Sequence, residues 1–177
     1  MTEQITILGA TGSIGCKTFD VIAQHYDRFQ VWGLSAETRM TKLAAMVQNS
    51  GAKVVAVGSK REEEFSLALG ASRPDIRVLE GKEGLNVLAE MSESNVVVTG
   101  IVGAAGLAPT LKAVRAGKKV LIANKEPLVM MGPEIMREAV LSGATIIPLD
   151  SEHNAIFQCL PDELRGNLAG LDGGEGN

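Results

Sequence analysis

Aromatic residues are scarce in this chain of 177 residues, which contains one tryptophan, one tyrosine and four phenylalanines. So few rings leave little surface on which nucleic-acid bases could stack. The formal net charge is −4 at pH 7, and the basic residues are scattered along the chain instead of following one face. Composition therefore argues against a nucleic-acid partner.

Cysteines and long apolar runs are also lacking. The two cysteines, Cys16 and Cys159, lie far apart and belong to no Cys-x-x-Cys pair, so we expect free thiols and neither a disulfide nor a zinc site. No apolar run approaches the length of a membrane span. The first predicted strand follows the N-terminus without a basic and then apolar leader. We therefore expect a cytoplasmic protein with no membrane partner.

What the chain does contain is a regular alternation of β-branched segments with segments of helical periodicity. Strands are expected at residues 5–8, 30–35, 53–57, 76–79, 95–100, 119–123 and 144–149, and helices are expected to begin near residues 13, 40, 61, 84, 109 and 133. The repeated βα order predicts an α/β fold, a Rossmann-like doubly wound parallel sheet with right-handed crossovers.

A glycine-rich turn joins the first expected strand to the first expected helix. Its glycines are Gly9, Gly12 and Gly15, and glycine allows the tight reversal and the close backbone approach that such a turn needs. The N-terminus of the following helix favours an anion such as a pyrophosphate. The spacing is one residue off the usual dinucleotide fingerprint. The pattern indicates nucleotide binding; the alternative is a glycine-rich turn with no ligand.

Three further segments follow predicted strands directly, at residues 35–39, 124–126 and 150–154. Because ligands of an open parallel sheet bind at the carboxyl ends of its strands, we expect these segments to lie beside the glycine turn. Glu37 suits the ribose hydroxyls of NAD, whereas Arg39 suits the 2′-phosphate of NADP. Taken alone, these two residues leave the choice of cofactor open, and a solvated charged loop is an equal alternative.

The other two segments carry residues suited to a phosphate and to a metal ion. Lys125 could anchor a phosphate or polarise a carbonyl as a point charge, or it could form a salt bridge within the loop. Asp150 and Glu152 flank a single residue, so in an extended segment both carboxylates point the same way and suit Mg²⁺ or Mn²⁺. Alternatively, Asp150 or Ser151 caps a helix that begins near Asn154.

Taken together, four blocks of the sequence resemble the 1-deoxy-D-xylulose 5-phosphate reductoisomerase family of the non-mevalonate isoprenoid pathway. The blocks occupy residues 9–15, 101–106, 123–126 and 150–158, and the resemblance extends from Ile5 to about Leu168. It implies conversion of 1-deoxy-D-xylulose 5-phosphate to 2-C-methyl-D-erythritol 4-phosphate by a carbon-skeleton rearrangement, followed by hydride delivery from NADPH. It also implies a homodimer for the intact enzyme.

The resemblance further implies roles for individual residues. The segment around Ile101 is expected to lie near the cofactor. The residues expected to bind NADPH are Gly9, Thr11, Gly12, Ser13, Ile14, Ala36, Glu37, Thr38, Arg39, Asn124 and Glu126. The expected Mg²⁺ or Mn²⁺ ligands are Asp150 and Glu152. The sugar-phosphate substrate is expected to contact Lys125, Ser151 and Glu152. Lys125, Asp150 and Glu152 are accordingly the expected catalytic residues.

Two departures from the family pattern modify these expectations. Glu37-Thr38-Arg39 stands where the family usually has Gly-Lys-Asn, so the basic residue has moved and Arg39 is its candidate replacement. Family members also continue well beyond the length of this chain. We therefore expect an NADP(H)-binding domain at 1–150, the beginning of a truncated catalytic region at 151–177, and no turnover by this piece alone. The alternatives are a free-standing nucleotide-binding module and another Rossmann oxidoreductase, such as a semialdehyde dehydrogenase.

Overall fold

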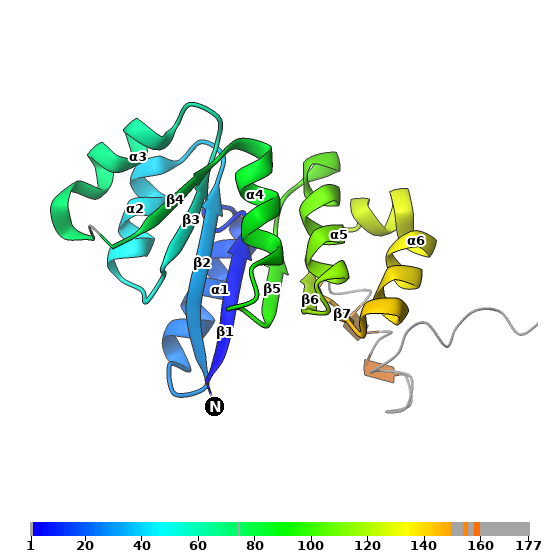
Figure 1. Ribbon diagram of the computed structural model, residues 1–177. Coiled ribbons are helices and arrows are strands. Elements are labelled where there is room, and N and C mark those ends of the chain that lie inside the picture. Colours follow the sequence, from blue (N-terminus) through cyan, green and yellow to red (C-terminus); the bar gives the residue numbers. More distant parts are fainter. Residues whose placement is uncertain (1, 74, 150–153, 156–157, 160–177) are drawn as a thin grey trace, which may run out of the picture.

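The fold is built on one sheet of seven parallel strands, with the order β4-β3-β2-β1-β5-β6-β7 (Figure 1). The computed structural model describes residues 2–73, 75–149, 154–155 and 158–159. The strands are β1 (Glu3–Leu8), β2 (Phe29–Ala36), β3 (Val54–Val57), β4 (Arg77–Glu80), β5 (Val96–Thr99), β6 (Lys119–Ile122) and β7 (Thr145–Pro148). The order reverses between β1 and β5, so the expected doubly wound parallel sheet is confirmed.

Helices cover both faces of this sheet (Figure 1). Contacts and core clusters place α1 (Ser13–Gln24), α2 (Met40–Gln48) and α3 (Glu62–Leu69) on one face. The other face carries α4 (Gly81–Glu90), α5 (Leu107–Arg115) and α6 (Glu126–Ser142). Two short 3₁₀ helices are η1 (Gly70–Ser72) and η2 (Gly103–Gly106). All the carboxyl ends of the parallel strands therefore meet at one edge of the sheet.

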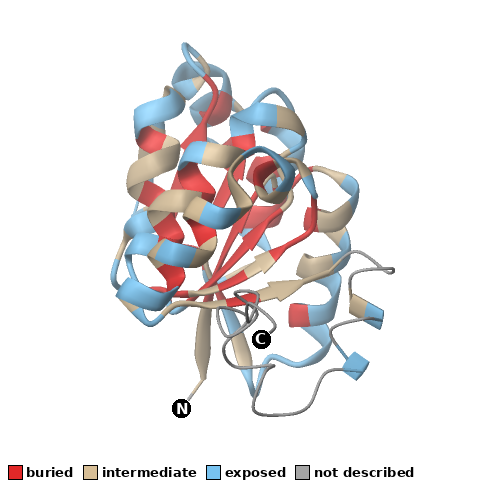
Figure 2. Ribbon diagram, turned by 90° about the vertical axis from the view of Figure 1, so that its right-hand side faces the viewer, coloured by how far each residue is buried: buried red, intermediate tan, exposed pale blue. Residues whose placement is uncertain are grey.

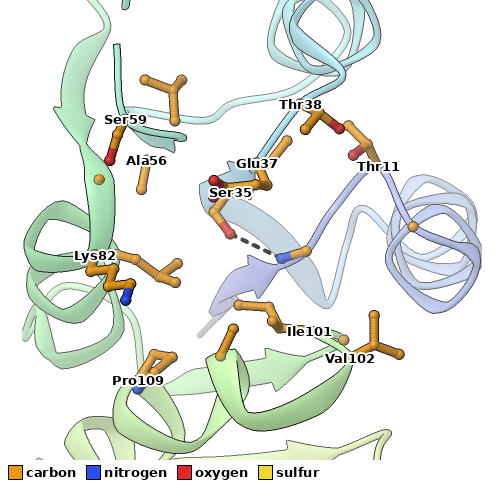
Figure 3. Close-up of a pocket in the computed structure, with 18 of the residues that line it drawn as sticks. Thr11, Ser35, Glu37, Thr38, Ala56, Ser59, Lys82, Ile101, Val102 and Pro109 are labelled. Carbon is orange, nitrogen blue, oxygen red and sulfur yellow. Dashed lines mark hydrogen bonds between the residues drawn. The ribbon is translucent and has the colours of Figure 1, made fainter. Parts of the chain in front are cut away.

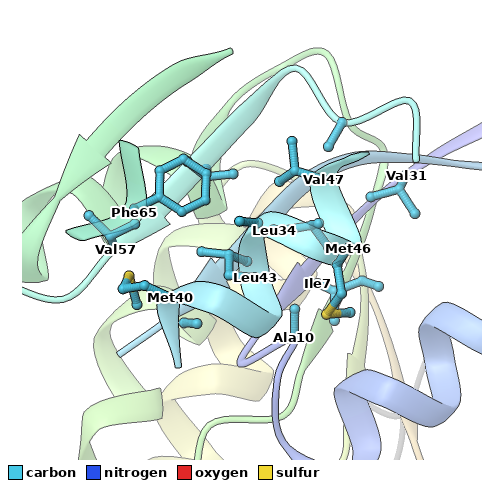
Figure 4. Packing of buried hydrophobic residues seen from close by; sticks show 14 of the residues in the cluster. Ile7, Ala10, Val31, Leu34, Met40, Leu43, Met46, Val47, Val57 and Phe65 are labelled. Carbon is cyan, nitrogen blue, oxygen red and sulfur yellow. The ribbon is translucent and has the colours of Figure 1, made fainter. Parts of the chain in front are cut away.

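The core explains why the strand sequences are apolar without alternation. β3 and β5 are buried at every position, as strands covered on both faces should be. Buried residues are concentrated in the strands and on the inner sides of the helices (Figure 2). On the α1–α3 face, Leu43 and Val47 of α2 pack with Leu34 and Phe65 (Figure 4). This packing fixes the helix α2 against β2 and so positions the segment that joins them.

The start of α6 differs from the expectation. The sequence placed this helix near Pro133, but it begins at Glu126 with Lys125 as its N-cap. Pro127 fits the first turn, where a missing N–H costs nothing. Pro133 lies inside the helix, and the non-helical backbone of Met131 (φ −144°, ψ 35°) marks a kink of the kind proline causes. Lys125 and Glu126 therefore belong to a helix start and not to a loop.

Two expectations drawn from absences concern the described residues. Cys16 and Cys159 are both free thiols, as expected. In the part of the chain that the structure describes, no helix combines the length and the apolar character needed to cross a membrane.

Candidate functional site

A cavity of about 650 Å³ opens at the carboxyl edge of the sheet (Figure 3). Its walls come from the β1–α1 turn, the segment after β2, the ends of β3 and β4, the start of α4 and the η2 region. The expected cofactor residues that line it are Gly9, Thr11, Gly12, Ala36, Glu37, Thr38 and Arg39. Four others, Ser13, Ile14, Asn124 and Glu126, lie outside its lining.

The β1–α1 turn is held by backbone contacts and by glycine. Gly9 has a positive φ of 79°, and its N–H donates to Ser35 Oγ at 2.9 Å. The N–H of Ala10 donates to Ser35 O at 2.7 Å, and that of Gly12 donates to Gly9 O at 3.0 Å. A Cβ at Gly15 would lie 2.4 Å from Gly9 O, so only glycine lets α1 approach this closely. Gly12 is the N-cap of α1 and offers no side-chain cap, which leaves the first N–H groups of the helix available to an anion.

The charged residues after β2 point in different directions. The Arg39 guanidinium donates from Nη1 to the carbonyl oxygen of Thr11 at 2.9 Å. The carboxyl carbon of Glu37 would lie 3.1 Å from a Cβ added to Gly58, so this side chain turns toward the end of β3 (Figure 3). Gly58 is required there because its Cβ would lie 2.3 Å from Glu37 O. The cation thus lies over the glycine turn, and the carboxylate faces the opposite wall.

Of that opposite wall, the family resemblance pointed only to the segment around Ile101, and the rest was missed from the sequence. The wall is formed by residues after β3 and β4 and by the η2–α5 region: Ser59, Gly81, Lys82, Leu85, Asn86, Ile101, Val102, Ala104, Ala105, Ala108 and Pro109. Of these, residues 101–106 belong to one of the blocks that carry the family resemblance. The signal for Ser59 and Gly81 was their position two residues after the ends of the predicted strands at 53–57 and 76–79. Using it requires knowing that β3 lies beside β2 and β4 beside β3.

Asn124 and Glu126 support the cavity wall from behind. The buried Asn124 side chain donates from Nδ2 to Ile101 O at 2.6 Å, and Glu126 Oε1 accepts from the Gly103 N–H at 3.4 Å. The Asn124 Oδ1 atom is buried and has no hydrogen-bond partner among the described residues. A buried amide oxygen normally has a donor, but Asn124 lies outside the cavity lining, so this atom is not open to a ligand in the cavity.

The expected metal and substrate residues are only partly described. Lys125 is exposed at the start of α6, while Asp150, Ser151, Glu152 and His153 lie outside the described residues. The N–H of Leu149 donates to Ile122 O at 2.8 Å, so the chain leaves β7 at the carboxyl edge. Within the described ranges, no group of three or more His, Cys, Asp or Glu residues could hold a metal ion.

Comparison with known proteins identifies relatives over most of the chain. A family model described as 1-deoxy-D-xylulose 5-phosphate reductoisomerase matches residues 5–132. A protein of that name from Pseudomonas putida (strain W619) is 51% identical over 168 residues, which is 94% of this chain and 42% of the relative. The chain therefore spans about two fifths of the length of the curated relatives it matches.

Solved structures give the same result. A DOX-P reductoisomerase in complex with NADPH, fosmidomycin and magnesium superposes with a TM-score of 0.91 and 40% identity, covering 96% of this chain and 42% of that chain. The 1-deoxy-D-xylulose 5-phosphate reductoisomerase of Zymomonas mobilis, in complex with NADPH, gives a TM-score of 0.87 and 38% identity over 93% of this chain and 43% of that chain.

Proposed function

The chain belongs to the 1-deoxy-D-xylulose 5-phosphate reductoisomerase family, and we propose that it is the NADPH-binding part of an enzyme that converts 1-deoxy-D-xylulose 5-phosphate to 2-C-methyl-D-erythritol 4-phosphate. The observation that carries the proposal is the cavity at the carboxyl edge, which unites the β1–α1 turn with the charged segment after β2. Parallel α/β sheets bind dinucleotides at this position, where the strand order reverses.

The residues of the cavity fit the parts of NADPH. The turn at Gly9–Gly12, with the uncapped start of α1, suits the diphosphate. Arg39, whose guanidinium already lies over this turn, suits the ribose 2′-phosphate because its planar fork matches phosphate oxygens. Asn124 and Glu126 would contribute from behind the lining, through their hydrogen bonds to the backbone of Ile101 and Gly103.

Bound NADPH supplies the hydride for the reduction. The chain's own residues would bind and orient it: the turn backbone would hold its diphosphate, and the Asn124 side chain, which donates to Ile101 O, holds this part of the cavity wall in place. We propose from the family resemblance that Lys125 and Ser151 bind the sugar phosphate and that Asp150 and Glu152 hold Mg²⁺ or Mn²⁺. The family resemblance also supports a catalytic region that begins at 151–177, a homodimer for the intact protein and a cytoplasmic location.

Calorimetric titration of this chain with NADPH and with NADH tests the binding proposal. We expect NADPH to bind and to bind more tightly than NADH, with or without Mn²⁺. A chain that binds neither dinucleotide, or that binds NADH alone, contradicts it.

Catalysis requires a separate measurement, because the chain covers 41% of the length of a Psychrobacter relative. We expect no NADPH oxidation when this chain is mixed with 1-deoxy-D-xylulose 5-phosphate and Mn²⁺, and oxidation by a chain extended to the length of its relatives. Turnover by the 177-residue chain would refute the proposal that this part binds NADPH and that catalysis requires the remaining length of the protein.

A further inference from the structure

We propose that Lys42 is a second cation for the ribose 2′-phosphate, and that Lys42 and Arg39 bind this phosphate together from the start of α2. The inference deepens the proposed NADPH site and rests on it. Lys42 was not among the expected cofactor residues. Its role follows from the contacts that it shares with Arg39.

Both cations converge on one backbone atom. Arg39 Nη1 lies 2.9 Å from Thr11 O, and Lys42 Nζ lies 3.4 Å from the same oxygen. Arg39 is the N-cap of α2, and Lys42 lies three residues later, a spacing that places two side chains on the same side of a helix. Thr11 and Arg39 line the cavity, whereas Lys42 lies outside its lining. The carbonyl oxygen of Thr11 therefore holds two full positive charges at one side of the cavity.

No carboxylate neutralises this pair among the described residues. Neither Arg39 nor Lys42 takes part in any of the salt bridges found among the described residues. The nearest acidic residue in sequence, Glu37, turns its carboxyl group toward Gly58 at the end of β3. Two cations that share one neutral acceptor interact more strongly with a dianion than with the carbonyl oxygen, because both partners then carry charge. The side of the cavity beside Thr11 is therefore suited to a phosphate monoester.

The position of the pair identifies which phosphate of the cofactor it meets. In dinucleotide-binding sheets the adenosine ribose lies at the end of the second strand, and its 2′ substituent is read by the residues that follow. Arg39 and Lys42 occupy this position after β2. The shared contact with Thr11 holds both side chains beside the turn before the ligand arrives, which reduces the conformational entropy lost on binding.

Two nucleotides that differ only in this group provide the test. We propose titrating the chain calorimetrically with 2′,5′-ADP and with 5′-AMP. The Lys42→Met variant should bind 2′,5′-ADP about tenfold more weakly, the loss typical of one charge-assisted hydrogen bond, while 5′-AMP binding stays within about twofold. Lys42→Arg, which keeps the charge, should retain most of the affinity for 2′,5′-ADP.

Lys53→Met is the matched control. It makes the same change at a half-exposed lysine of the opposite edge, which pairs with Asp75 at 3.7 Å, and it should leave both affinities unchanged. The inference fails if Lys42→Met weakens both nucleotides equally, or neither. If the unmodified chain binds neither NADPH nor 5′-AMP, it is the proposed cofactor site that fails.

Discussion

The two edges of the sheet are built in opposite ways. At the carboxyl edge, β1, β3, β4 and β5 are each followed directly by a glycine: Gly9, Gly58, Gly81 and Gly100. At the amino edge, long cationic side chains occupy the corresponding space, with Arg73 and Lys118 covered by protein. Glycines at the carboxyl edge leave backbone groups facing the cavity. At the amino edge, the long side chains of Arg73 and Lys118 donate hydrogen bonds to backbone carbonyl groups. A second cavity of about 700 Å³ does lie at the amino edge beside Gln30 and Lys53, but around Arg73 and Lys118 long donors fill the space. We call this part of the amino edge the closed edge, and the carboxyl edge the open edge.

The closed edge depends on two side chains that bond backbone carbonyls. Arg73 donates to Val47 O and Ser50 O, both at 3.2 Å, and to Ala52 O at 2.6 Å. Lys118 Nζ donates to Ser94 O at 2.7 Å and to Met91 O. Val47 lies in the last turn of α2, and the other carbonyls lie in the segments that lead into β3 and β5. Val47 O also accepts from the Ser50 N–H at 3.3 Å, and Met91 O from the Ser94 N–H at 3.4 Å. Each cation therefore adds donors to carbonyls of which some are already paired.

The largest effect should come from filling the tightest approach at the open edge. A Gly15→Ala substitution places its Cβ 2.4 Å from Gly9 O and 2.5 Å from Ala10 Cα. These are backbone atoms, so α1 must move, and we expect unfolding to become easier by about 3 kcal/mol with loss of NADPH binding. Urea denaturation and calorimetry measure the two effects.

Gly132→Ala is the control for this prediction, because a Cβ at Gly132 meets nothing within 4 Å. It should keep both stability and binding. If Gly15→Ala behaves like Gly132→Ala, then the glycine is not what shapes the open edge.

The contribution of the closed edge to the free energy of unfolding should depend on pH. Burial lowers the pKa of Lys118 from 10.5 to about 8. Between these values the unfolded chain holds the proton more tightly than the folded chain, so the free energy of unfolding should rise with pH from about 8 to 10.5, by up to about 3 kcal/mol. Below pH 8 both states carry the proton and the contribution is constant. Urea melts across this range, with Lys118→Met as the reference, measure the difference. A reference curve with the same slope as the unmodified protein would remove Lys118 as the cause.

Arg73 should matter somewhat less, because its side chain is partly exposed. Arg73→Met leaves the carbonyls of Val47, Ser50 and Ala52 without this donor, and we expect a loss of about 2 kcal/mol. The Arg73 hydrogen bond also lowers the pKa of Asp75 to about 2. The stability from this pair is complete above pH 4 or so and is lost as the pH falls toward 2. Arg73→Lys, which keeps the charge but not the fork, should recover only part of the loss in a thermal melt.

The open edge was predictable from the sequence because its determinants are local. Gly9, Gly12 and Gly15 follow an apolar strand directly. The order of strand, tight turn and helix then determines where the backbone of this turn lies in the fold. The segment at 36–39 was found by the same rule. What could not be predicted is how segments distant in sequence are placed together. Lys82 belongs to the cavity only because β4 lies at the far side of β3, and sequence periodicity does not give strand order.

The closed edge was not predictable, because its key residues read as surface charges. Nothing near Lys118 in the sequence distinguishes it from Lys119, yet Lys118 is 4% exposed and its neighbour is not buried. The start of α6 was missed for another reason. Proline is favoured in the first turn of a helix, so the sequence placed the start at Pro133, whereas the helix begins at Glu126 and continues past a kink at Met131.

The smallest loss of stability is expected at Lys119, the neighbour of Lys118 in sequence, and the two lysines allow an exposed and a buried side chain to be compared. Lys119 Nζ pairs with Glu3 Oε1 at 2.8 Å, with side chains 41% and 34% exposed. An exposed pair is weakened by water and by the entropy of holding two long side chains. We therefore expect Lys119→Met to cost only about 0.5 kcal/mol, with half a molar sodium chloride or so reducing that difference further. Because Lys118→Met changes the same residue type one position earlier, urea melts of the two variants compare burial directly. A cost for Lys119→Met equal to that for Lys118→Met would mean that surface ion pairs, and not buried donors, close this edge.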